Sequence, residues 1–184
     1  MKKILTAVIL SAFLIVSNNF CNAQMPRKEM YLGGLTFGTS TAQMLKMYSA
    51  PNKTEGGIEH LYTCYYGNGV KLSYNAYANK IFEIVVSENN GWNTPRGLAV
   101  GMTFDKAVEL YGDADFAKFG DEKIVYAYFP TSGDKHDFAF LVVVDSATEK
   151  ILQMEITGNN TMALFDDFFE SHVDKLLETQ EQTE

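Results

Sequence analysis

The residues best suited to metal or nucleophilic chemistry in this sequence are three histidines and two cysteines. His60, His136 and His172 show no His-x-x-x-His spacing, and no Cys-x-x-Cys pair accompanies them, so we predict neither a metal centre nor a cofactor. Cys64 lies in the aromatic run 61–66 without an adjacent Lys or Arg, which predicts a buried, inert thiol. Gly-x-Ser-x-Gly and nucleotide-binding glycine motifs are missing too. The sequence therefore predicts a protein that is not an enzyme.

A second group of candidates consists of tyrosines and polar residues that alternate with apolar ones along predicted strands. Such alternation places one set on a free sheet face and the other toward a core. A free sheet face with aromatic rings among polar side chains is typical of a protein-binding surface. The candidates for this face are Tyr65, Lys71, Glu83, Tyr126, Tyr128 and Gln153, and Trp92 in the linker 89–96 is a further candidate.

The aromatic candidates also have purely structural interpretations. Tyrosine is common on strands, where it can fill cross-strand pairs on a face that has no partner. Trp92 can equally fill the seam between two halves of the chain. The sequence leaves both interpretations open.

An internal repeat organises the elements that must position these residues. The pattern Gly-x-[Ser/Thr], followed by apolar residues and a tyrosine, occurs at 38–49 and again at 101–112. Repeats of this kind indicate a structural unit used twice. The second copy carries a longer polar loop at 131–137, so we expect it to contribute more to specific binding.

Each copy predicts a helix followed by three strands joined by short links, which pair as an antiparallel meander. The helices begin after Ser40 and Thr103, both of which are good N-cap residues. The predicted strands are 61–66, 70–74, 81–86, 124–129, 140–144 and 151–156. We therefore predict an α+β fold: a tandem repeat of a helix and an antiparallel β-meander, with helices on one sheet face, plus a C-terminal helix at about 161–179.

The first residues predict export. Lys2 and Lys3 precede the apolar run 4–16, and small residues end at Ala23, as in a secretory signal peptide spanning 1–23. A lipid anchor through Cys21 is the weaker alternative. Residues 24–184 then form a single domain with repeats at about 33–97 and 98–157, located in the periplasm or secreted. The formal net charge of −8 disfavours nucleic acid, and no later segment is long enough to span a membrane.

The opening Gly101-Met102-Thr103, the helix ending at Tyr111-Gly112 and the tyrosine-rich strand that follows resemble a known family. They are similar to the tandem repeats of the β-lactamase inhibitor protein family and to the outer-membrane assembly lipoproteins of the SmpA/OmlA type. The resemblance covers about residues 33–157, with Thr39 where the pattern has methionine. The inhibitors carry disulfides within their repeats, whereas this chain keeps only Cys64 after loss of the leader.

The resemblance implies a secreted protein that binds another extracytoplasmic protein through its sheet face, with no enzyme target and no contact residue carried over. The predicted function is therefore a secreted or periplasmic, non-enzymatic protein-binding module. The alternative is a small-molecule or lipid carrier with a pocket between the two repeats.

Overall fold

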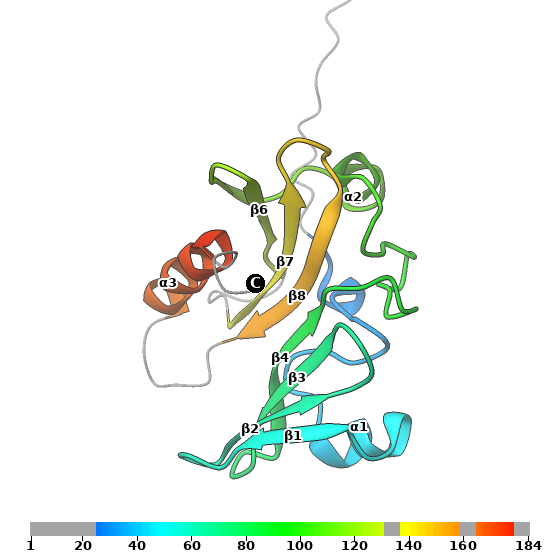
Figure 1. The fold of residues 1–184 in the computed structure, drawn as a ribbon, viewed down its shortest axis with the longest axis vertical. Coiled ribbons are helices and arrows are strands. Elements are labelled where there is room, and N and C mark those ends of the chain that lie inside the picture. Colours follow the sequence, from blue (N-terminus) through cyan, green and yellow to red (C-terminus); the bar gives the residue numbers. More distant parts are fainter. Residues whose placement is uncertain (1–24, 131–136, 159–164, 179–184) are drawn as a thin grey trace, which may run out of the picture.

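A computed structural model describes residues 25–130, 137–158 and 165–178, which form three α-helices and one eight-stranded sheet (Figure 1). The strands run antiparallel in the order β1-β2-β3-β4-β8-β7-β6-β5. The helices are the 3-10 helix η1 (Arg27–Glu29), α1 (Thr41–Tyr48), α2 (Phe104–Tyr111) and α3 (Phe165–Glu178). The strands are β1 (Lys53–Gly56), β2 (Leu61–Tyr65), β3 (Val70–Asn75), β4 (Lys80–Val86), β5 (Phe116–Phe119), β6 (Lys123–Tyr128), β7 (Phe138–Asp145) and β8 (Ile151–Gly158).

The predicted α+β class with an antiparallel sheet is confirmed, but the sheet has two more strands than expected. The edge strands β1 and β5 are only four residues long, and all four residues of β1 are exposed. Short edge strands carry little alternation for a sequence pattern to detect. The predicted signal peptide, residues 131–136 of the predicted loop and the expected start of the last helix lie outside the described residues.

The sheet joins the first and second halves of the chain at its centre, where β4 pairs with β8. In this pairing Val85 lies opposite Glu155, and Glu83 lies opposite Thr157. Polar residues contributed by β3, β4 and β8 are therefore brought together on one face of the sheet.

Each of the first two helices is tied to a central strand at its start. Ser40 caps α1 by accepting a hydrogen bond from the backbone N–H of Gln43 at 3.2 Å, as predicted, whereas the Thr103 side chain makes no such bond. The backbone N–H of Gly38 donates to Ile81 O, and that of Gly101 donates to Ile151 O, both at 2.8 Å. These bonds hold α1 beside β4 and α2 beside β8.

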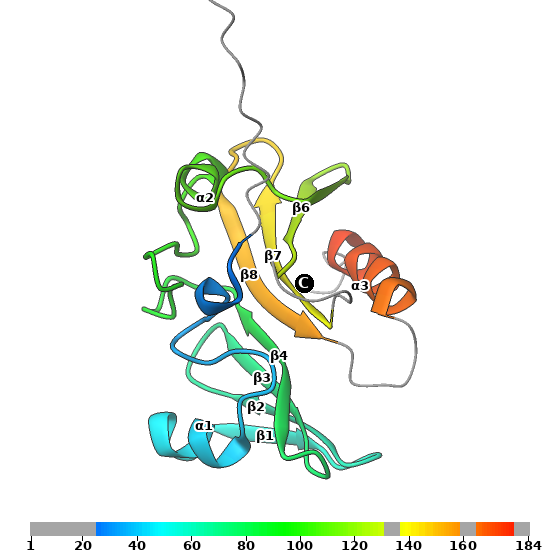
Figure 2. The same ribbon diagram turned by 180° about the vertical axis from the view of Figure 1, so that it is seen from behind.

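The main core lies between the sheet and α1, α2 and the N-terminal segment, which crosses this face between the two helices (Figure 2). The residues predicted to face a core on the third strands of each copy include Ile84, Val86, Met154 and Ile156, and all four are buried here. Cys64 is buried in the same core, as predicted. The N-terminal segment adds four fully buried residues that no strand or helix pattern marked: Met25, Met30, Leu32 and Leu35.

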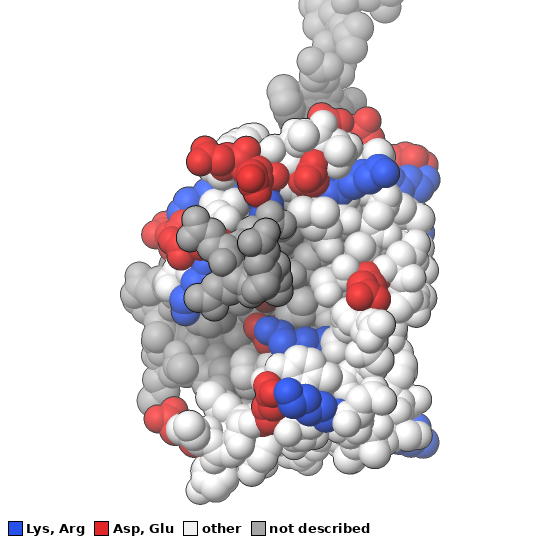
Figure 3. Space-filling model, in the orientation of Figure 1, with Lys and Arg blue, Asp and Glu red and all other residues white. Residues whose placement is uncertain are grey.

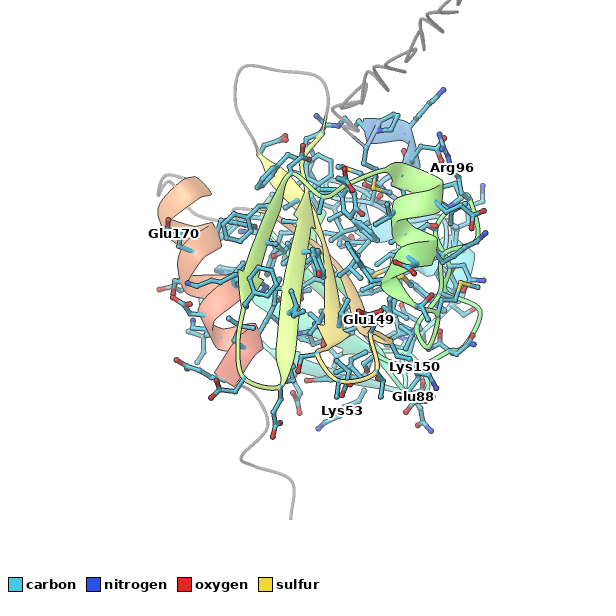
Figure 4. The ribbon with its side chains drawn as sticks, turned by 90° about the horizontal axis from the view of Figure 1, so that it is seen from above. Lys53, Glu88, Arg96, Glu149, Lys150 and Glu170 are labelled. Carbon is cyan, nitrogen blue, oxygen red and sulfur yellow. The ribbon has the colours of Figure 1, made fainter. Side chains whose placement is uncertain are left out.

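A second, smaller core lies on the opposite face, between α3 and the strands β6 and β7. Figure 4 shows α2 and α3 on opposite sides of the strands. The prediction that this face is free of helices is therefore wrong for the second half of the sheet. The apolar stripe of α3 must be buried somewhere, and small residues such as Ala127 and Ala139 leave room for Phe169 and Val173.

Two β-bulges shape the central strands. Ser73 pairs with Glu83 and Tyr74 with Ile81, so Phe82 is the extra residue in β4. In the same way Val143 pairs with Gln153 and Val144 with Ile151, so Leu152 is the extra residue in β8. A bulge turns the residues after it toward the other face. Leu152 alternates in sequence with Gln153 and Glu155, as Met154 and Ile156 do, and this pattern predicts a place in the main core; the structure instead places Leu152 in the lining of a cavity on the opposite face.

Candidate functional site

Four of the seven predicted binding residues lie on one face of the sheet. Tyr65 on β2 pairs with Lys71 on β3, which pairs with Val85 on β4. Glu83 on β4 and Gln153 on β8 lie on the same face of the sheet as Lys71, and all three line the same cavity. The structure therefore brings Lys71, Glu83 and Gln153 together, with Tyr65 beside them.

The other two tyrosines point into the opposite face, so their predicted placement is wrong. Tyr128 is fully buried in the main core, where its hydroxyl donates to Gly112 O at 3.1 Å. Tyr126 is half-buried and stacks on Phe104 of α2, with ring centroids 3.6 Å apart. Their neighbours Val125 and Ala127 face α3 instead. Because both faces of β6 are covered, its residues 124–128 are all apolar or aromatic, and alternation cannot identify the face.

Trp92 does not lie on the face of the sheet that carries Lys71, Glu83 and Gln153. Its ring stacks on Tyr48 of α1, with centroids 4.2 Å apart and planes at 26°. Tyr66 lies further away at 6.4 Å. These partners belong to the first half of the chain, so Trp92 packs against the main core beside α1.

The packing of Trp92 makes a strong demand on Gly33. Gly33 has φ +56°, and a Cβ there would lie 2.5 Å from Trp92 Cε3 and 2.7 Å from the Tyr48 hydroxyl. Gly38 has φ +80° with nothing within 4 Å of such a Cβ. We expect Gly33→Ala to lower the free energy of unfolding by about 2–4 kcal/mol, and Gly38→Ala by about 1 kcal/mol, because only the first adds overlap to backbone strain. Urea denaturation of both variants measures the difference, and equal effects would contradict this packing.

An open cavity of about 380 Å³ lies between the sheet and α3, where β4 meets β8. Figure 3 shows basic and acidic side chains next to each other in the hollowed middle of this face. Strands of both halves and α3 contribute to it. Its lining consists of Lys71, Glu83, Val85, Lys123, Val143, Leu152, Gln153, Glu155, His172 and Leu176.

On the side of the first half, a chain of polar contacts ends at Glu83. Ser73 Oγ donates to Glu83 Oε2 at 2.7 Å, and Thr63 Oγ1 lies 3.2 Å from Ser73 Oγ. Lys71 Nζ lies 3.1 Å from the same Glu83 oxygen. Glu83 Oε2 therefore holds two partners on this side, a hydroxyl and an ammonium.

On the side of the second half, Glu155 and His172 join the sheet to α3. Glu155 Oε1 lies 2.5 Å from His172 Nε2, and Glu155 Oε2 accepts a hydrogen bond from Gln153 Nε2 at 3.0 Å. The Glu155 side chain is only 1% exposed and that of His172 is 17% exposed. A carboxylate this deeply buried needs both partners, because desolvation of an unpaired charge costs several kcal/mol.

The charges of the cavity favour protonated His172 and Lys71. Burial acts against the charged form of His172, but the hydrogen bond to Glu155 and the charges of Glu155 and Glu83 outweigh it and raise the pKa. Burial likewise opposes the charge of Lys71, and Glu83, followed by Glu155, outweighs it and raises its pKa. Lys71 and His172 are therefore held beside the carboxylates of Glu83 and Glu155, and Lys123 is a third basic residue of the lining.

Two of the central residues, Glu155 and His172, were not predicted as site residues. Glu155 alternates with apolar residues in β8, and this alternation did place it on the face of Lys71 and Glu83. His172 lies on α3 three residues after Phe169, beside the buried stripe. No local spacing connects it to Glu155, because only the docking of α3 on the sheet brings the two together. Glu83, Glu155 and His172 also offer three metal-ligand atoms within 4.8 Å of one another.

Comparison with known proteins shows a fold but no family. No family model matches the chain, and no curated protein does either. A crystal structure of a cysteine-rich secretory protein from Staphylococcus aureus is similar, with a TM-score of 0.50 and 12% identity, over 75% of this chain and 48% of that one. An extracellular protein with an SCP domain from Bacillus anthracis gives a TM-score of 0.46 and 8% identity, over 67% and 44%. The chain thus spans about half the length of these proteins.

The predicted resemblance to β-lactamase inhibitor proteins and SmpA/OmlA lipoproteins is wrong. The similarity found is instead to the cysteine-rich secretory protein, and at 12% identity it extends to the fold alone. Among the helices that the structure describes, none combines the length and the apolar character needed to cross a membrane. The chain shares its α+β architecture with about half of a bacterial secretory protein that has a solved structure.

Proposed function

We propose that this chain is an extracytoplasmic, non-enzymatic binding module whose ligand is a small polar molecule held in the cavity beneath α3. The observation that carries the proposal is the convergence of Lys71, Glu83, Glu155 and His172 in one open cavity. Buried ion pairs add little to stability compared with apolar packing. Ionisable groups gathered in a concave site are therefore more typical of binding than of a fold that only needs a core.

The lining also narrows the chemistry of the ligand. A cavity of about 380 Å³ lies near the lower end of the sizes typical of small-molecule sites. Its walls present Lys71 and Lys123 as cations, Glu83 and Glu155 as anions, and the Gln153 amide. A small ligand with both acidic and basic groups can pair with such walls, whereas a lipid chain would leave their polar groups unpaired.

Export of the chain is part of the proposal. It is supported by the predicted signal peptide at 1–23, and by the description of the structurally similar Staphylococcus aureus protein as secretory. The acidic composition supports a ligand other than nucleic acid.

We also propose that the chain is a tandem repeat of one unit, as the sequence predicts. In each half a helix precedes four strands. The backbone N–H of the glycine before each helix donates to the carbonyl of an isoleucine in the last of these strands: Gly38 to Ile81 in β4, and Gly101 to Ile151 in β8. The bulged residues Phe82 and Leu152 directly follow these isoleucines. The cavity then lies where the two units meet, which is where the predicted carrier alternative places its pocket.

A protein partner on the same face remains a second candidate. Tyr65 is partly exposed on β2, and its hydroxyl donates to Glu55 Oε2 at 2.8 Å on the exposed edge strand β1. An exposed edge strand beside an aromatic side chain can pair with a strand of another protein. Loss of a bound extracytoplasmic protein in Tyr65→Ala, with the cavity residues intact, would favour this candidate.

The experiment for the primary proposal uses chelator-treated protein and a panel of amino acids, dipeptides and dicarboxylates, with binding measured by calorimetry. We expect at least one compound to bind, and Leu152→Trp to weaken its binding at least about tenfold, because an indole at this bulged position takes up cavity volume while every charged residue of the lining is kept. Leu45→Trp is the matched control, since Leu45 is 47% exposed on α1, on the opposite face. No binding by any compound, or equal loss in both variants, would count against the cavity as the site.

A further inference from the structure

We infer that the deep end of this cavity is a divalent transition-metal site, with Glu83, Glu155 and His172 as its three protein ligands. The inference rests on the proposed function, because it assigns a first ligand to the same cavity. One oxygen from each carboxylate and one nitrogen of the imidazole lie within 4.8 Å of one another. The three residues come from β4, β8 and α3.

The donor set indicates an ion of the Zn²⁺ class. An imidazole nitrogen with two carboxylates suits Zn²⁺ or Mn²⁺ better than Mg²⁺, which prefers oxygen and retains water. Zinc bonds of about 2.0–2.2 Å require the farthest ligand atoms to approach by roughly 1 Å. Two ligand atoms of one zinc ion lie roughly 3.3 Å apart at these bond lengths. Glu155 Oε1 and His172 Nε2, which lie 2.5 Å apart, therefore separate slightly as the imidazole releases its proton to solvent, and the Glu83 side chain, which is 14% exposed, rotates toward them.

The surroundings of the two carboxylates match those of metal ligands. Ser73 holds Glu83 through Oε2, and Gln153 holds Glu155 through Oε2. In Glu155 this leaves Oε1 facing His172. Hydrogen bonds to the outer oxygens of ligating carboxylates fix the orientation of the inner ones. Three protein ligands in an open cavity also leave a coordination position for a ligand from outside.

Lys71 is the group that opposes a cation here. Its ammonium lies 3.1 Å from Glu83 Oε2, so it competes with a metal ion for that carboxylate. Its side chain is 39% exposed, and a flexible lysine stem can carry the ammonium toward solvent. Removing this charge while keeping the stem is therefore expected to tighten metal binding, a result that a site elsewhere on the protein would not give.

The experiment titrates ZnCl₂ into chelator-dialysed protein by calorimetry, with elemental analysis after desalting. We expect one zinc per chain, at least about tenfold weaker binding in Glu83→Gln and His172→Ala, and tighter binding in Lys71→Met. His60→Ala is the matched control, because His60 is exposed in the turn between β1 and β2, and β3 separates β2 from β4. The zinc affinity of this variant should stay within about twofold of the wild type. Glu83→Gln guards against a folding artefact, since it keeps the shape of the side chain and Glu83 is not part of the apolar cluster that packs α3 on the sheet.

Two outcomes would overturn the inference: zinc no higher than in the dialysed blank, or Glu83→Gln binding zinc like the wild type. If organic compounds bind chelator-treated protein and zinc does not, the metal site fails while the proposed binding function stands. If neither binds, both fail.

Discussion

Replacing Tyr128 by alanine will lower the free energy of unfolding by about 3–5 kcal/mol, the range for removing a large buried ring. Tyr128 is fully buried, and its hydroxyl donates a hydrogen bond to Gly112 O. Its ring centroid lies 6.2 Å from that of Phe140 and 6.3 Å from that of Tyr111. The alanine variant loses this packing and leaves a cavity. Urea denaturation followed by circular dichroism measures the change.

The matched control for this prediction is Tyr65→Ala on the opposite face. Tyr65 is only partly buried, and its hydroxyl bonds the exposed Glu55. We expect its loss to change stability by less than about 1 kcal/mol. Similar costs for the two tyrosines would mean that both lie on the same face, as the sequence suggested, and would contradict the described register of β6.

The second large effect on the free energy of unfolding is expected from breaking the pair between Glu155 and His172. Glu155→Ala leaves a buried imidazole without its carboxylate, and we expect a loss of about 3 kcal/mol in chelator-treated protein at pH 6. Replacing both residues by leucine should recover most of this loss, because an apolar pair of similar volume avoids the desolvation of two charges. Denaturant unfolding of the single and double variants gives the coupling between the two sites.

The same pair has a defined pH dependence. The pKa of His172 is raised in the folded state, so the stabilisation is fully present below its unfolded value of about 6.5 and is lost as pH rises through the folded-state pKa. The groups facing the imidazole are Glu155, Glu83 and Lys71. The cost of Glu155→Ala should therefore shrink between pH 6 and pH 9. A cost that stays constant across this range would contradict a charged pair.

The central strands could be predicted from the sequence because their alternation reflects one buried and one open face. This is why Lys71, Glu83 and Gln153 were correctly placed together. The same rule failed for Tyr126 and Tyr128, since β6 is covered on both faces and every residue from 124 to 129 is apolar or aromatic. A shift of one residue then exchanges the two faces.

Other features depended on long-range docking. The edge strand β1 consists of exposed residues, and its pairing with β2 follows from the chain reversal between them. The contact between His172 and Glu155 exists because the stripe containing Phe169 and Val173 packs on β6 and β7. Neither the bulge at Leu152 nor this packing has a local sequence signal, so the residues that α3 and Leu152 add to the lining of the cavity could not be predicted.

The central claim is that the ligand site of this protein is the cavity between α3 and the junction of β4 with β8. The most direct measurement is a map of backbone amide chemical shifts during titration with the tightest-binding compound of the panel. We predict that the largest changes will occur at Lys71, Glu83, Gln153, Glu155 and His172. Changes confined to Tyr65 and the edge strand β1, or no changes at saturating concentrations, would contradict it.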